Sequence, residues 1–125
     1  MVPRVGPIDP SAPLRIELAC ESGHAVAFAF WHRPPDTGEW KKFAEGRTGD
    51  GQGGSDTHHT SIDTQPRAQI YYWVAVSNPA RPHAAYHARL SLTQRDTLVP
   101  HGSIDLTGTT DAAGNDSVEQ WLDLV

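Results

Sequence analysis

The sequence predicts an antiparallel β-sandwich of about seven or eight strands, and two observations indicate this fold class. Apolar and polar residues alternate along several short segments, which is typical of strands that bury one face. In addition, 11 glycines and 10 prolines are spread along the 125 residues, so many turns join short elements. The length corresponds to one domain with one core.

Four strongly alternating segments are the main strands of the predicted sandwich. They are LRIELAC (14–20), AVAFAFWH (25–32), AQIYYWVAVS (68–77) and AYHARLSLT (85–93). The turn sequence PPDTG follows the second of them and leads into EWKKFAE as a return strand, while TLV and SIDLT are shorter candidates. The inward faces supply the predicted core: Leu14, Ile16, Leu18, Phe28, Phe30, Ile70, Tyr72, Val74, Leu90 and Leu92.

Residues 111–125 form an acidic amphipathic C-terminal segment. Its apolar residues Val118, Trp121, Leu122 and Val125 have the spacing of one helix face, and this favours a short C-terminal helix. The alternative is a final strand. We therefore expect residues 1–12 to be an N-terminal extension or edge strand, residues 13–110 to form the sandwich, and residues 111–125 to be the C-terminal segment.

Charge and cysteine content limit the partners that we expect. The formal net charge is −5, and no lysine or arginine follows Arg95. Such a chain lacks the basic surface that nucleic acids or anionic membranes require, so neither is expected as a partner. Cys20 is the single cysteine and excludes an intrachain disulfide. With no readable signal peptide or apolar span, we expect a soluble cytoplasmic protein, although an exported protein without its leader would look the same.

The order of Cys20, Trp31 and Tyr72 resembles the pattern of immunoglobulin-like domains. Those domains place a cysteine, a core tryptophan and a tyrosine two residues before a second cysteine, and Val74 stands here at the second cysteine position. The segments FWHRPPDTGEW and SNPARPHAAYH also resemble hairpins of immunoglobulin and fibronectin type III folds. The resemblance covers roughly residues 13–94 and implies a sandwich of this type, or a jelly roll, without implying a site.

The segment GDGQGGSDTHHTSID (49–63) suggests a metal or phosphate site at first sight. Neighbouring residues of a strand point to opposite faces, so His58 and His59 are not expected to bind one metal ion together. The glycines lack the lysine and helix of a phosphate loop, and the acids lack the spacing of a calcium hand. We predict a loop that enters an edge strand, and no cofactor. A metal site formed across strands would instead use His59, His83, His87 and His101.

The sequence gives little support for catalysis. No serine lies in a nucleophile elbow, and the carboxylates are spread through turns, so no acid–base pair can be assigned. Cys20 closes an apolar strand face, which predicts a buried, unreactive thiol. We therefore expect a protein that is not an enzyme.

Aromatic residues are the stronger indication of function. Trp31, Tyr71 and Trp73 alternate with core residues, so their rings lie on an outer sheet face. Such rings can anchor a protein partner or stack on sugars, unless the C-terminal segment or a second subunit covers them. Trp121 and Leu122 are the anchors expected in the C-terminal segment. The leading hypothesis is a non-catalytic interaction module that binds a protein or forms a homo-oligomer. The alternative is a carbohydrate- or metal-binding sandwich.

Overall fold

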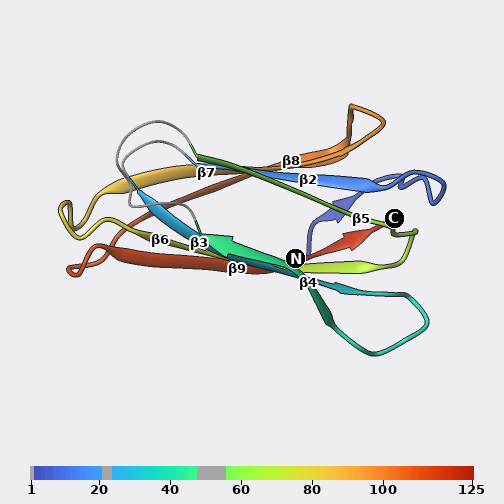
Figure 1. Cartoon of the computed structure of the whole chain (residues 1–125), viewed down its shortest axis with the longest axis horizontal. Helices are drawn as coiled ribbons and strands as arrows, with labels where there is room; N and C mark the ends of the chain where they lie inside the picture. Colours follow the sequence, from blue (N-terminus) through green and yellow to red (C-terminus); the bar gives the residue numbers. More distant parts are fainter. Residues whose placement is uncertain (1, 21–23, 48–55) are drawn as a thin grey trace.

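Two β-sheets pack face to face in the computed structural model, which describes residues 2–20, 24–47 and 56–125 (Figure 1). The strands are β1 (Arg4–Val5), β2 (Leu14–Cys20), β3 (Ala25–Arg33), β4 (Lys41–Arg47), β5 (Asp56–Ile62), β6 (Gln69–Ser77), β7 (Ala85–Gln94), β8 (Thr97–Thr109) and β9 (Asn115–Leu124). Within the described ranges the chain is all-β, and the predicted β-sandwich is confirmed. No helix in these ranges has the length and apolar character needed to span a membrane.

One sheet has five strands in the order β1-β9-β6-β3-β4, and we call it the front sheet. The other has four strands in the order β5-β2-β7-β8, and we call it the back sheet. All pairings are antiparallel except the parallel pair of β1 with β9. The two short candidates TLV and SIDLT belong to one long strand, β8, and the segment 56–62 forms the predicted edge strand β5.

The core lies between the two sheets and consists of the inward residues of alternating strands. All ten residues predicted for it are buried, with exposed fractions of 7% or less. Cys20 is also buried, as the sequence predicts. Alternation therefore located the core correctly, because a strand side chain can only point into the sandwich or away from it.

The predicted C-terminal helix is wrong, because residues 115–124 form strand β9 between β1 and β6. The register pairs Val118 with Val74 and Leu122 with Ile70, so these side chains join the core face of the sheet. Leu122 and Leu124 are fully buried. A helix of this length gains little by itself, whereas pairing with β6 gives the segment interstrand hydrogen bonds and a buried apolar face.

A hydrogen bond between the two sheets fixes β9 near its start. The Tyr86 hydroxyl on β7 donates to the Asp116 carboxylate on β9 at 2.5 Å. Gly108 on β8 leaves room for this contact, because a Cβ there would lie 2.5 Å from the tyrosine oxygen and 2.7 Å from the carboxylate oxygen. Burial and this hydrogen bond raise the pKa of Tyr86, so its hydroxyl remains a donor at neutral pH.

Replacing Tyr86 with phenylalanine is expected to lower the free energy of unfolding by about 1–3 kcal/mol, because a half-buried Asp116 carboxylate loses its donor. Tyr71→Phe is the matched control, since it removes an exposed tyrosine–carboxylate hydrogen bond, to Glu119. Urea denaturation of both variants measures the difference. Equal losses of unfolding free energy in the two variants would contradict the stabilising role of the Tyr86–Asp116 hydrogen bond.

A hydrogen-bonded turn holds the N-terminal segment against the end of β7. The Gln94 side chain accepts from the Asp9 backbone N–H at 2.9 Å and donates to the Asp9 and Ala12 carbonyls at 2.8 and 2.9 Å. The Ser11 hydroxyl and backbone N–H both donate to the Asp9 carboxylate, with Arg95 beside it. These contacts lower the pKa of Asp9 from 3.8 to about 2.

A pH dependence of stability follows from Asp9. Its folded-state pKa is lower than the unfolded value, so the ionised carboxylate favours the folded state. The stabilisation is complete above about pH 4 and is lost as the pH falls towards about 2. We expect wild type to be more stable than Asp9→Asn at pH 7. Near pH 2 the two proteins should have nearly the same stability. Urea unfolding between pH 2 and 7 tests this, and a constant difference would contradict it.

Candidate binding face

The outer face of the front sheet carries one row of aromatic side chains across its three central strands. The register places Trp31 on β3 opposite Tyr71 on β6, and Tyr71 opposite Trp121 on β9. Their neighbours Phe30, Tyr72 and Leu122 are buried in the core, so the row points away from it. Trp40 lies just before β4 and adds a fourth ring beside Tyr71. We call Trp31, Trp40, Tyr71 and Trp121 the aromatic cluster.

Tyr71 is the centre of the aromatic cluster. Its ring centroid lies 5.2 Å from that of Trp31 and 6.2 Å from those of Trp40 and Trp121. The ring planes are inclined to Tyr71 by 59°, 68° and 39° respectively. The rings therefore form a cup rather than a flat platform. They line a hollow of about 540 Å³ together with Arg33 and Gln69.

The aromatic cluster is accessible to a ligand. Trp121 and Trp40 are 46% and 37% exposed, and Trp31 and Tyr71 are half-buried. None of the chain's four tryptophans belongs to the buried core, which is built from aliphatic residues, phenylalanines and tyrosines. Exposed aromatic surface gathered at one place is typical of a binding site, because burial of these rings is favourable and the fold itself does not use it fully.

Polar side chains frame the aromatic cluster and are linked to one another. Arg33 donates to Gln69, and the Gln69 amide donates to the Asp123 carboxylate at 2.6 Å. The Arg33 guanidinium also lies 4.9 Å from the centre of the Trp40 ring. On the β9 side, Tyr71 donates to Glu119. This hydrogen bond raises the pKa of the Tyr71 hydroxyl.

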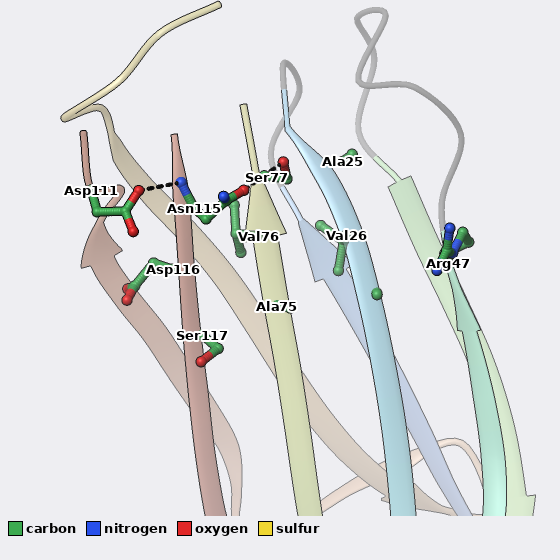
Figure 2. A pocket seen from close by; sticks show the side chains of 11 residues that line it. Ala25, Val26, Arg47, Ala75, Val76, Ser77, Asp111, Asn115, Asp116 and Ser117 are labelled. Carbon is green, nitrogen blue, oxygen red and sulfur yellow. Dashed lines mark hydrogen bonds between the residues drawn. The ribbon is translucent and has the colours of Figure 1, made fainter. Parts of the chain in front are cut away.

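The opposite end of the same sheet face is a trough of small residues (Figure 2). Its floor contains Ala25, Ala27, Ala75, Ser77 and Ser117, and its volume is about 670 Å³. Figure 2 shows Arg47 at one side of the trough and Asp111 at the other, where the aspartate accepts from the backbone N–H of Asn115. The trough has no aromatic lining, so it offers no stacking surface.

Three of the five predicted binding residues come together in the aromatic cluster, namely Trp31, Tyr71 and Trp121. Trp73 lies on the same face but does not line the hollow, since it stands opposite Ala29 and Glu119. The prediction that Leu122 anchors a partner is wrong, because its side chain is fully buried in the core. The sequence did not single out Trp40 and Gln69, which also line the hollow. Trp40 directly precedes β4 and Gln69 begins β6, and these positions were the available signal.

The residues that carry the immunoglobulin-like resemblance agree with it only in part. Tyr72 is buried, as the resemblance implies, but Trp31 lies on the outer face instead of in the core. The strands β6 and β9 are neighbours in the front sheet, and the β7–β8 hairpin of the back sheet lies between them in sequence. The membership of such a family stays a prediction.

The histidines considered as metal ligands, and His58 beside them, lie on the back sheet or in the turn before β7, not on the strands of the aromatic cluster. His58 faces Phe28, with ring centroids 4.8 Å apart, whereas His59 points outward beside Arg15 and Glu17, so the predicted opposite orientation is confirmed. His87 contacts Asp105 at 3.1 Å, while His83 and His101 lie in a turn and on β8. In the part of the chain that the structure describes, no three histidine, cysteine or acidic side chains gather as metal ligands. The glycines of the 49–63 segment lie outside the described residues.

Comparisons with protein-family models, with curated proteins and with solved structures find no match to this chain. The function is therefore inferred from the geometry of the site. Two features indicate this function: the accessible aromatic cluster and the linked polar groups of Arg33, Gln69 and Asp123.

Proposed function

We propose that this chain is a non-catalytic carbohydrate-binding domain that holds an oligosaccharide on the aromatic cluster. The observation that carries the proposal is the outward-facing row of Trp31, Tyr71 and Trp121 with hydrogen-bonding groups at its border. A pyranose ring has an apolar face of C–H groups and a rim of hydroxyls. The negative face of an aromatic ring attracts the C–H groups, while carboxylates, amides and guanidinium groups bind the hydroxyls.

The inclination of the rings supports a single oligosaccharide chain rather than a flat crystalline surface. A flat surface would contact rings that share one plane, whereas the neighbours of Tyr71 are turned from it by 39° to 68°. The successive units of a twisted oligosaccharide present their faces in different directions and can meet such rings one after another. The hollow of about 540 Å³ also lies within the range of small-molecule sites, about 300–1,000 Å³.

The polar frame supports binding because its groups are already held in place. Arg33 and Gln69 are linked by a hydrogen bond, as are Gln69 and Asp123, and Glu119 is held by Tyr71. Side chains that are ordered before the ligand arrives lose less conformational entropy on binding.

Protein binding or self-association through the same face is the second candidate function. Tryptophan, tyrosine and arginine dominate the binding energy of protein interfaces, so the aromatic cluster would also suit a protein partner. In a symmetric dimer formed through this face, the two copies would not be complementary in both shape and charge. A twofold axis across the strands would lay the aromatic row over the trough of a second copy, but would also place Glu119 against Glu119 and Lys42 against Arg47. An axis along the strands would leave the two troughs facing each other with a gap.

Retention on a panel of immobilised neutral and acidic oligosaccharides tests the proposal. The samples are wild type, Trp121→Ala and the control Leu98→Ala, which removes another exposed apolar side chain, 49% exposed, on β8 of the back sheet. We expect wild type and Leu98→Ala to be retained by the same sugars and Trp121→Ala to be released. Absence of retention on every sugar, or equal retention of all three proteins, would overturn the proposal. A dimer in solution that Trp121→Ala dissociates would instead assign the face to self-association.

A further inference from the structure

A second hollow adjoins the aromatic cluster and shares Arg33 and Gln69 with it. Its volume is about 600 Å³, and it is lined by three arginines from separate parts of the chain. Arg4 comes from β1, Arg33 from the end of β3, and Arg67 from the turn before β6. We call it the arginine hollow.

The arginine hollow is positive within a chain of net negative charge. Asp123 is the acidic side chain in its lining, so three guanidinium groups line the hollow together with one side-chain carboxylate. That carboxylate already accepts a hydrogen bond from Gln69. Among the residues that the structure describes, neither Arg4 nor Arg67 forms an ion pair with an acidic side chain. Both side chains are exposed, and their donors are available to a ligand.

The backbone holds Arg67 in an unusual conformation at the rim. Its φ is 76°, in the left-handed region that non-glycine residues rarely adopt, and its N–H donates to the Leu124 carbonyl at 2.7 Å. Such a conformation costs free energy and persists where the surrounding structure maintains it, often at binding sites. The docking of this turn on β9 brings Arg67 to the same hollow as Arg4.

We infer that the oligosaccharide is acidic, and that the arginine hollow binds its carboxylate or sulfate group while neighbouring sugar rings lie on the aromatic cluster. This inference rests on the proposed function. Guanidinium groups match the planar oxygen pairs of a carboxylate and bind sulfate oxygens in the same way, through two parallel hydrogen bonds. Arg33 belongs to both hollows, so the charged group and the stacked rings would lie within one short oligosaccharide.

The charges beside the rings favour an acidic sugar over a single-stranded nucleic acid. A nucleic acid also combines stacking with negative charge, but it carries a phosphate on every unit. Glu119 and Asp123 lie along the β9 side of the aromatic cluster and would repel those phosphates. The hydroxyl groups of a sugar can instead donate to these two carboxylates, while its acidic group remains in the arginine hollow.

Titration calorimetry with matched sugars tests the inference. The ligands are a uronic acid oligosaccharide, the same oligosaccharide with its carboxylates reduced to alcohols, a sulfated neutral oligosaccharide and an oligothymidylate. The proteins are wild type, Arg4→Gln, Arg67→Gln, Trp121→Ala and the control Arg81→Gln, whose exposed side chain lies in the turn before β7. The two acidic sugars distinguish recognition of a carboxylate from that of a sulfate.

We expect wild type and Arg81→Gln to bind at least one acidic sugar about tenfold more tightly than the reduced sugar, a preference that added salt weakens. Arg4→Gln and Arg67→Gln should lose this preference and keep their affinity for the reduced sugar. Equal affinity for acidic and reduced sugars, lost in Trp121→Ala alone, would overturn the inference and support the proposed function. Absence of sugar binding would overturn both, as would tight binding of the oligothymidylate in place of the sugars.

Discussion

Replacing Tyr71 with alanine is expected to weaken oligosaccharide binding more than any other single change in the aromatic cluster. Tyr71 contacts the other three rings, so its loss removes one stacking surface and releases the orientation of its neighbours. Central aromatic anchors of this kind contribute about 2–4 kcal/mol, which corresponds to a loss of affinity of about 30- to 1,000-fold. Titration calorimetry measures the effect.

Two further variants make the Tyr71 result specific. Tyr71→Phe keeps the ring and removes only the hydrogen bond to Glu119, so we expect an affinity loss below about tenfold. Lys42→Ala removes a charge 5.8 Å from the Trp31 ring and should change affinity little, since the amine is exposed. If Tyr71→Ala bound as tightly as wild type while folding normally, the aromatic cluster would not be the binding site.

Replacing Leu122 with alanine is expected to lower the free energy of unfolding by about 2–5 kcal/mol. Its side chain is fully buried in the core opposite Ile70, and truncation leaves a cavity between the sheets. The adjacent Trp121 points outward and is 46% exposed, so Trp121→Ala should cost much less stability despite removing more atoms. Urea denaturation of the two variants compares the two faces of β9 directly.

The comparison of Leu122→Ala with Trp121→Ala also tests whether the C-terminal segment is a strand. A helix would have placed Trp121 and Leu122 on the same apolar face, and both substitutions would then be costly. Equal destabilisation by the two variants would contradict the assignment of β9 to the front sheet. Far-UV circular dichroism of wild type with a strong helical signal would contradict it as well.

The core could be predicted from the sequence because alternation depends on one strand at a time. The alternation of Leu14, Ile16 and Leu18 identifies the buried face of β2 without knowledge of the neighbouring strands. The C-terminal segment is ambiguous because Val118 and Leu122 fit both a helical period and a strand period. Pairing with β6 and β1 favours the strand, and the local sequence does not predict this tertiary contact.

The candidate site could be predicted only in part, for a related reason. Alternation placed Trp31 and Tyr71 on an outer face, but the row they form with Trp121 depends on the register between three strands. Trp40 reaches Tyr71 from the loop before β4. The arginine hollow brings together residues 4, 33 and 67, and no local pattern relates such distant positions.

The indole N–H signals of the tryptophans give the most direct test of the central claim that the aromatic cluster binds an oligosaccharide. The chain has four tryptophans, of which Trp31, Trp40 and Trp121 line the hollow and Trp73 does not. In a heteronuclear NMR titration with the oligosaccharide that the panel selects, we predict that the signals of those three tryptophans move and saturate together. The Trp73 signal should move less. Unchanged signals from Trp31, Trp40 and Trp121, with shifts confined to the trough or the back sheet, would contradict the claim.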